Sequence, residues 1–294
     1  MDALQTYLEA CKEEVNAYLS RLFEPTGLHA RLKEAMTYSL MADGKRLRPA
    51  LVIATAETFG VARRLVLPAA AAVELIHCYS LIHDDLPCMD DDDLRRGQPT
   101  NHVVFGEAMA LLAGDALLTE AFHLLARPLA GVPAERQLAM IRALASRAGV
   151  DGMVGGQAVD IERTGGQGTL QDVEFIHLHK TARLIQACVE IGGYFADLDD
   201  EVRDALSRYG ECLGLAFQMI DDVLDVTAST EQLGKTAGKD VEEGKLTYPR
   251  FVGVERTRQM AREVIRHGEQ ALADVGVKSE PLAALQSLIV DRDR

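Results

Sequence analysis

Two clusters of aspartate follow long apolar segments of the sequence. The first reads DDLPCMDDDD at Asp84–Asp93, after AAAVELIHCYSLIH, and the second reads DDVLD at Asp221–Asp225, after LGLAFQMI. The apolar segments are typical of buried helices, where grouped carboxylates are costly unless cations neutralise them. A solvated acidic surface is the alternative for either cluster alone. Two such clusters, each beside basic segments, favour a cation site.

Magnesium is the cation that best suits these clusters. Mg²⁺ takes oxygen ligands and keeps several waters, so it can bridge carboxylates to phosphates. Asp221 and Asp225 are four residues apart and therefore lie on one face of a helix. If that helix faces the one that ends at Asp84, the carboxylates can hold a small group of Mg²⁺ ions around one diphosphate. Neutralising its charge makes diphosphate a good leaving group.

Basic residues near both clusters are candidates for binding diphosphates. The segment Gly44–Pro49 reads GKRLRP before a helix in which Pro49 suits the first position. Cations at a helix N-terminus oppose the helix dipole, and a bound anion would compensate for this. The other candidates are Arg95 and Arg96 after the first cluster, Lys180 and Thr181 in HLHKTARL, and Lys235, Lys239 and Lys245 in a glycine-rich loop. Each of these alone is also consistent with charge balance or a surface position.

Two histidines precede the first cluster. His77 lies seven residues before Asp84, which is two helical turns along the same face, and could donate a hydrogen bond to a diphosphate oxygen. A satisfied core histidine is the alternative for His77. His83 is expected to be structural.

The elements that position these residues are predicted to be helices. A chain of 294 residues with 48% hydrophobic and 5% aromatic residues, rich in Ala and Leu, favours helices over strands. Apolar periodicity predicts helices near 2–23, 28–42, 49–59, 65–85, 106–126, 134–147, 149–162, 170–194, 200–227, 246–274 and 280–290, with a capping box at Thr169 and Asp172 and no convincing strand. No shift in composition marks a boundary, so residues 1–294 are expected to form one all-α domain.

Composition also excludes several classes of protein. The net charge of −14 argues against binding nucleic acid or anionic lipid. The N-terminus lacks an apolar signal region, and the uncharged apolar stretch Leu65–Val73 is far shorter than the roughly 20 residues that span a bilayer. The five cysteines are widely spaced without a CxxC, so a disulfide framework or zinc ribbon is not expected. We therefore expect a cytoplasmic protein without membrane insertion.

The motifs together resemble the trans-isoprenyl diphosphate synthase family, most closely its bacterial farnesyl diphosphate synthases. They are GKRLRP, DDLPCMD followed by RRG, GGQ at 155–157 with Asp160, HKT at 179–181, FQ at 217–218, DDVLD and GK at 234–235. Their order and separation match the family over roughly residues 30 to 250. The first motif has the two-residue insertion of the bacterial class.

The resemblance implies a large antiparallel helical bundle around a central active-site cavity, usually a homodimer. It implies that Asp84 and Asp90 bind two Mg²⁺ ions and Asp221 a third, with Asp85, Asp222 and Asp225 in the same motifs. By the same resemblance, isopentenyl diphosphate is bound by Lys45, Arg48, His77 and Arg96, and the allylic diphosphate by Arg95, Lys180, Thr181, Gln218, Lys235 and Lys245.

Product length is predicted from the helix that ends at Asp84. An allylic tail anchored there would run back along the helix, where Ser80 lies one turn below and Tyr79 adds an aromatic ring. An aromatic floor at this depth favours the C15 product, farnesyl diphosphate, over C10 or C20, and it resembles the bacterial farnesyl pattern.

Other functions stay open at this stage. A class I terpene cyclase also uses aspartate-rich Mg²⁺ sites, but it needs no second diphosphate pocket such as GKRLRP and Arg96 suggest. A catalytically silent subunit of a heteromeric synthase tends to lose one aspartate motif, and both are present here. An acidic helical scaffold that binds metal incidentally would not need the separate basic pockets.

Overall fold

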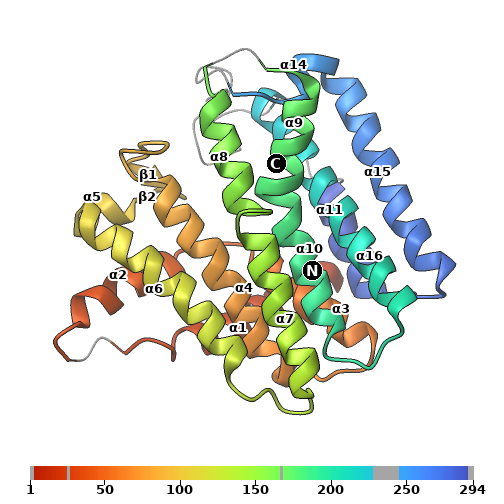
Figure 1. Ribbon diagram of the computed structural model, residues 1–294, viewed down its shortest axis with the longest axis horizontal. Helices are drawn as coiled ribbons and strands as arrows, with labels where there is room; N and C mark the ends of the chain where they lie inside the picture. The colour runs from red at the N-terminus through yellow and green to blue at the C-terminus, as the bar shows by residue number, and fades with distance from the viewer. Residues whose placement is uncertain (1–2, 25–26, 166–167, 228–244, 291–294) are drawn as a thin grey trace.

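The protein is a bundle of helices, as the sequence predicts (Figure 1). The computed structural model describes residues 3–24, 27–165, 168–227 and 245–290. The α-helices are α1 (Ala3–Leu19), α2 (Ala30–Leu40), α3 (Leu47–Thr58), α4 (Arg63–Asp84), α5 (Asn101–Phe105), α6 (Glu107–Ala126), α7 (Ala134–Ala148), α8 (Met153–Arg163), α9 (Leu170–Ile176), α10 (Arg183–Gly193), α11 (Asp200–Thr227), α14 (Tyr248–Val252), α15 (Val254–Asp274) and α16 (Glu280–Val290).

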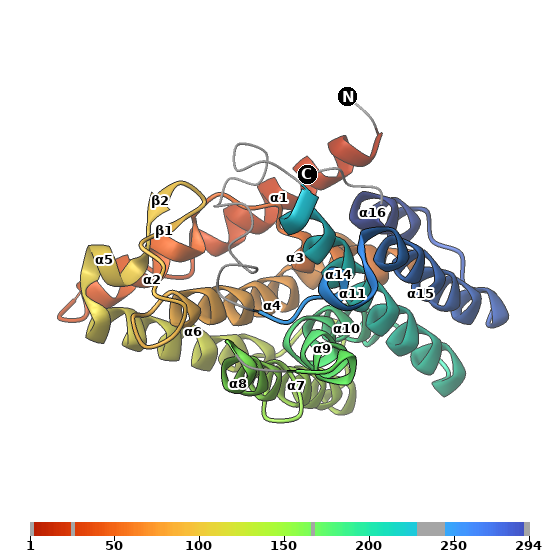
Figure 2. The same ribbon diagram turned by 90° about the horizontal axis from the view of Figure 1, so that it is seen from above.

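The long helices pack in an order that brings the two aspartate clusters into the middle of the bundle. α6 packs on α4, α4 on α3, α3 on α10, α10 on α11, and α11 on α15. Figure 2 shows α4 and α6 side by side toward one end and α15 with α16 toward the other. The helices that carry the clusters, α4 and α11, are therefore both central elements.

Four features differ from the helices that periodicity predicts. The expected helix 170–194 is α9, a π-helical turn η1 (His177–Ala182) and α10, and the expected helix 246–274 is divided at Gly253 into α14 and α15. Gly253 has a φ of 82°, which interrupts a right-handed helix. The short helix α5 and a two-stranded hairpin were not predicted from the sequence.

The hairpin follows the first aspartate cluster. Strand β1 (Leu94–Arg95) pairs antiparallel with β2 (Gln98–Pro99), and the two turn residues Arg96 and Gly97 have φ values of 54° and 74°. Positive φ at both central residues is the conformation that two-residue hairpin turns require, and Gly97 adopts it without strain. The strands are too short to show the alternation by which strands are recognised in a sequence.

Two local predictions about helix starts have opposite outcomes. The capping box at Thr169 is confirmed, because its hydroxyl accepts from the Asp172 N–H and the Asp172 carboxylate accepts from the Thr169 N–H. The prediction that Pro49 is the first residue of its helix is wrong. α3 begins at Leu47, and Arg46 is its N-cap residue with a left-handed φ of 49°.

Arg46 holds this strained N-cap in place from within the core. Its guanidinium is 4% exposed and pairs with Glu74 of α4 at 2.7 Å, and it also donates to Asn16 Oδ1 and to the Leu40 carbonyl. A buried charge with a full set of partners is tolerated, whereas removing one partner leaves the other uncompensated. The basic segment GKRLRP is thus fixed to α1, α2 and α4 at once.

Two helices, α4 and α6, are long and apolar enough to cross a membrane by length and composition. The apolar window of α4 is 67% buried inside the fold, as expected for a core helix, and that of α6 is 39% buried. The sequence prediction considered only uncharged stretches, and it therefore missed both helices. Length and composition alone are weak evidence for insertion.

Replacing Arg46 by Met is expected to lower the free energy of unfolding by about 3–5 kcal/mol, because Glu74 stays buried without its counter-ion. Urea denaturation would measure this. The control is Lys12→Met, which removes a more exposed pair with Asp43 and should cost less than about 1 kcal/mol. Equal losses in the two variants would contradict the role of Arg46.

Candidate active site

The end of α4 and the loop after it bring Asp84 and Asp90 together. Asp84 is the last residue of α4, and the Asp90 N–H donates to the Asp84 carbonyl at 2.9 Å. Gln157 of α8 donates to Asp84 Oδ1 at 3.0 Å. Burial raises the pKa of Asp84 to about 6, with the charge of Lys180 opposing the shift and that of Asp90 adding to it. The carboxylate therefore lies in a setting that favours a bound cation.

Asp85 has a different surrounding from Asp84. It is 4% exposed and accepts from Arg95, whose Nη2 lies 2.6 Å and Nε 2.7 Å from Asp85 Oδ1. Burial raises the pKa of Asp85, although the hydrogen bond from Arg95 opposes the shift. The sequence placed Arg95 at the allylic diphosphate, whereas the structure pairs its guanidinium with Asp85. This pair fixes hairpin β1–β2 to the end of α4.

In the second cluster, Asp222 ties α11 to two other segments. Its carboxylate is 2% exposed and accepts from the Tyr248 N–H at 2.9 Å and from Gln218 Nε2 at 3.1 Å. The ring of His177 also approaches, with Nε2 3.5 Å from Asp222 Oδ2. These contacts favour a positioning role for Asp222 over direct metal binding. Asp225, one turn further, is 3% exposed.

The π-helical turn η1 carries the HKT motif and connects the two clusters. Lys180 Nζ lies 2.6 Å from Asp160 Oδ2, and its charge also acts on Asp84. Thr181 donates to Gln218 Oε1 at 2.8 Å, which joins η1 to α11. π-Turns inside helices are frequent at functional sites because they change the direction of side chains.

Two glycines let η1 fit between its neighbours. A Cβ at Gly156 of α8 would overlap the backbone of Lys180, and a Cβ at Gly214 of α11 would overlap Ala182. The GGQ motif therefore has a structural reason. Gly156 allows the close approach, while Gln157 and Asp160, three residues apart on one helix face, reach Asp84 and Lys180.

Gln157, Asp160 and His177 were not predicted as site residues. The first two stand in motifs that the sequence shows, but their partners are distant along the chain. His177 is buried, and burial lowers its pKa to about 3, so the imidazole is neutral. For His177, which lies outside these motifs, the sequence signal is polarity on the apolar side of a helix.

Arg48 and His77 form a basic pair between α3 and α4. Arg48 Nη1 lies 3.4 Å from His77 Nε2. Because a guanidinium only donates, Nε2 must accept and the imidazole proton is on Nδ1. Burial lowers the pKa of His77 well below its usual value, and the charge of Arg48 adds to this. Arg48 Nε is buried without a hydrogen-bond partner among the described residues, which suits an anionic acceptor such as a phosphate oxygen.

Charge interactions place this pair near the second cluster. Burial lowers the pKa of Arg48, and the negative charges of Glu74 and Asp221 oppose the shift. The charge of Asp221 thus acts on Arg48, which in turn contacts His77.

The remaining predicted basic residues have separate surroundings. Arg96 donates to the Asp43 carbonyl and packs so closely on Gly44 that a Cβ there would overlap its guanidinium. Lys45 is exposed, and Lys245 Nζ lies 3.8 Å from Asp90 Oδ1. Lys235, predicted for the allylic diphosphate, and Lys239 lie outside the described residues.

The two predicted chain-length residues on α4 have different surroundings. Tyr79 is 5% exposed, and burial raises the pKa of its phenol to about 12, to which the charge of Asp84 adds. Ser80 donates to the carbonyl of His77 in its own helix, 2.9 Å away. Of the two side chains, that of Tyr79 is the larger.

The donor set fits Mg²⁺ in one respect and leaves the three-ion prediction untested. No group of three or more His, Cys, Asp or Glu side chains in the described part of the chain is arranged to hold a metal ion. Mg²⁺, however, is usually held by one or two carboxylates together with waters and substrate phosphates. Asp84 beside Asp90, and Asp221 across the bundle, would offer such incomplete sets.

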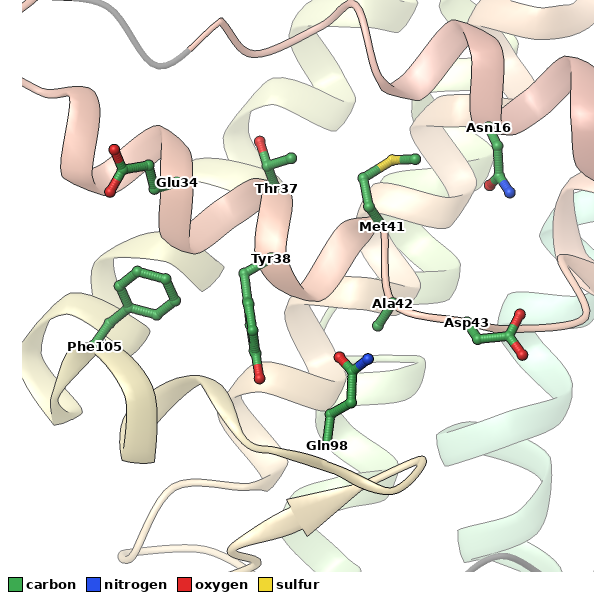
Figure 3. Close-up of a pocket in the computed structure, with 9 residues that line it drawn as sticks. All are labelled: Asn16, Glu34, Thr37, Tyr38, Met41, Ala42, Asp43, Gln98 and Phe105. Atoms are coloured by element: carbon green, nitrogen blue, oxygen red, sulfur yellow. The ribbon is translucent and has the colours of Figure 1, made fainter.

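A cavity of about 690 Å³ lies away from the aspartates, between α1, α2 and hairpin β1–β2. Figure 3 shows Tyr38, Met41 and Gln98 around it, and it contains no residue of either cluster. It lies beside Asp43, whose carbonyl accepts from Arg96.

Comparison with known proteins decides the family. The family model described as polyprenyl synthetase matches residues 29–280. The chain belongs to the polyprenyl synthetase family. It is therefore a prenyltransferase that elongates isoprenyl chains, from a family that depends on Mg²⁺.

Individual relatives of this polyprenyl synthetase agree in fold and differ in the product they are named for. A chloroplastic geranylgeranyl pyrophosphate synthase from Catharanthus roseus is 47% identical over 272 residues, which is 92% of this chain and 75% of the relative. The structure of an FPP/GFPP synthase from Zymomonas mobilis has a TM-score of 0.88 and 37% identity, covering 98% of this chain and 99% of that one. A geranyltransferase from Helicobacter pylori, complexed with magnesium and isoprenyl diphosphate, has a TM-score of 0.85 and 30% identity, covering 99% of each chain.

Mg²⁺ and inorganic diphosphate added together are expected to raise the Tm of this polyprenyl synthetase by more than the sum of their separate effects, because each neutralises charge that the other brings. Differential scanning fluorimetry would measure the shift. Asp84→Asn should lose most of the joint effect. Asp93→Asn, which changes an exposed carboxylate of the same cluster, should keep it. A merely additive shift in the unmodified protein would contradict the site.

Proposed function

We propose that this polyprenyl synthetase joins isopentenyl diphosphate to an allylic diphosphate by ionisation, condensation and elimination, in the region between α3, α4, η1 and α11. The observation that carries the proposal is the pairing of anion-binding and cation-binding groups there. Asp221 acts electrostatically on Arg48, whose buried Nε has no hydrogen-bond partner among the described residues, and Lys180 acts on Asp84. A site for two diphosphates needs both kinds of group.

Mg²⁺, when bound by Asp84, Asp90 and Asp221, would supply the charge neutralisation that lets diphosphate leave the allylic substrate. Lys180 lies close enough to Asp84 to influence its pKa, and it would contact the same departing diphosphate. Asp160, at 2.6 Å from Lys180 Nζ, fixes the direction of the ammonium group. Asp222 and Gln218 would keep α11 and η1 in register while the charges move.

Isopentenyl diphosphate would be held on the opposite side by Arg48, His77, Lys45 and Arg96. His77 is neutral and its Nε2 is engaged by Arg48, so the Nδ1–H is the group available to donate to a phosphate oxygen. The buried end of Arg48 offers a second donor at Nε. Positioning the double bond against the allylic carbon is then the main catalytic contribution of these residues.

The final proton would go to the departing diphosphate. The allylic cation would be stabilised by the neutral oxygen dipoles of Thr181 and Gln218, which are hydrogen-bonded to each other. Neither side chain is a strong nucleophile that would trap the cation. This assignment needs no dedicated side-chain base.

For the product, we propose farnesyl diphosphate with C15. The buried ring of Tyr79, five residues before Asp84, supports a short tail pocket. Geranylgeranyl diphosphate, with C20, is the second candidate. The names of the curated relatives support it better than C15, because the Catharanthus roseus relative and several from Arabidopsis thaliana are named geranylgeranyl pyrophosphate synthases. The solved relative from Zymomonas mobilis is named for farnesyl and longer products. We further propose the homodimer that the sequence resemblance implies.

A product assay tests the reaction. The protein with Mg²⁺, isopentenyl diphosphate and dimethylallyl or geranyl diphosphate is expected to give mainly a C15 alcohol after dephosphorylation. Asp84→Ala and Asp221→Ala should each lower kcat by at least about 10²-fold, because the neutralising charge at the leaving group is lost. Asp93→Ala is the matched control and should retain activity. Cyclic hydrocarbon, or no condensation, would instead support a terpene cyclase or a silent subunit.

Tyr79→Ala is expected to lengthen the product, because removing the ring opens space along α4 for a further isoprene unit. Chain length of the dephosphorylated products would be measured by gas chromatography. Tyr79→Phe keeps the ring volume and should keep the product of the unmodified protein. A Tyr79→Ala enzyme with unchanged product length would refute this floor, and a dominant C20 product from the unmodified protein would do the same.

A further inference from the structure

We propose that His83 of α4 and Gly114 of α6 position the ring of Tyr79 and thereby set product length from outside the substrate pocket. This inference rests on the proposed role of Tyr79 as the floor of the tail pocket. His83 would be a positioning residue, and Gly114 would be the position on α6 that gives it room.

The contact between His83 and α6 is close and specific. His83 Nε2 lies 3.0 Å from the carbonyl oxygen of Leu111. Because a carbonyl only accepts, the imidazole donates from Nε2, which fixes both its tautomer and its ring direction. Asp115 Oδ1 lies further away, 3.9 Å from the same nitrogen. The ring is therefore anchored on α6 by one backbone hydrogen bond.

Gly114 makes this contact possible. A Cβ at Gly114 would overlap three atoms of the His83 imidazole, although α6 is otherwise a regular helix whose interior would be more stable with alanine. The glycine therefore has a packing reason, since it admits the imidazole into the surface of α6. α4 and α6 lie side by side in both views (Figures 1 and 2).

Tyr79 contacts the same imidazole. The two residues are four apart on α4, so their side chains share a helix face. Their ring centroids are 5.7 Å apart at an interplanar angle of 80°, an edge-to-face contact. The phenol ring is thus held against His83, which is held against α6. A change at Gly114 would therefore reach Tyr79 through His83.

The two substitutions are expected to act in opposite directions. Gly114→Ala pushes the imidazole off α6 toward Tyr79, which narrows the tail pocket and shortens the product. His83→Ala leaves a space into which the Tyr79 ring can move, which lengthens the product. One methylene in an apolar pocket changes discrimination by about tenfold or more, so we expect shifts of about that size in the ratio of longer to shorter product.

The test measures product chain lengths from dimethylallyl and isopentenyl diphosphates for the unmodified enzyme, both single variants and the double variant. His83→Ala removes the three atoms that a Cβ at Gly114 would approach most closely, so the double variant should give the product ratio of His83→Ala alone. Gly114→Ala in the Tyr79→Ala background should have no effect on the ratio. If Gly114 has only a structural role, Gly114→Ala should change the melting temperature or total turnover in every background. It should not shift the product ratio in a way that depends on His83 and Tyr79.

Thr119→Ala, an exposed change further along α6, is the matched control and should keep the product ratio. Product ratios that stay unchanged in both single variants, while Tyr79→Ala shifts them, would overturn the proposed positioning of Tyr79 by His83 and Gly114. The proposed reaction would remain intact. A Gly114→Ala effect that persists without the His83 imidazole would also overturn it. Absence of any condensation by the unmodified enzyme would instead refute the proposed function. If Gly114→Ala fails to fold, the product ratio of His83→Ala still tests the proposal, because this substitution removes atoms from the contact and introduces no overlap.

Discussion

The structure depends on holding carboxylates in its interior close to cations that cannot fully neutralise them. Burial raises the pKa of Asp84 from 3.8 to about 6. The folding free energy that this burial costs therefore grows as the pH rises from about 4 to about 6 and is complete above 6, and the cost is absent at lower pH, where the group is protonated in both states. Lys180, Gln157 and Arg95 reduce the electrostatic strain on the Asp84–Asp85 pair without removing it. A site with this residual negative potential attracts a divalent cation, and the cation in turn attracts a diphosphate. The net negative charge of the whole chain does not prevent diphosphate binding, because the basic residues proposed to bind it are concentrated near the aspartates.

The second constraint is that these groups must meet from helices far apart in the sequence. η1 solves this by a local change of register, since its π-turn directs Lys180 toward α8 and Thr181 toward α11. The turn fits only because Gly156 and Gly214 lack side chains where it approaches α8 and α11. Asp222 then joins α11 to α14 through the Tyr248 N–H. Keeping the charged residues without these glycines would not preserve the geometry.

Much of this could be predicted from the sequence, and the exceptions share a physical origin. Apolar periodicity predicts the all-α fold, and aspartates placed directly after apolar segments predict a cation site. Both signals are local in the sequence. The pairing of Arg95 with Asp85, of Lys180 with Asp160 and of Arg46 with Glu74 depends on tertiary packing. From the spacing of residues in the sequence alone, a basic residue that pairs with an internal carboxylate cannot be distinguished from one that binds a substrate phosphate. The split at Gly253 and the start of α3 at Leu47 were missed because a left-handed residue reads as an ordinary loop or helix residue in the sequence.

The same distinction explains why product length is harder to read than the reaction. The reaction requires charges, and charges in apolar surroundings are visible in the sequence. In the proposed function, product length depends on the position of one ring to within the size of a methylene group, and neighbours that carry no chemistry would set that position. Tyr79 is visible five residues before Asp84, whereas the contact that fixes it involves a histidine anchored on a backbone carbonyl and a glycine on another helix. On this proposal, relatives that share this fold can be named for products of different length, because a change as small as one methyl group beside such a ring would alter the depth of the pocket.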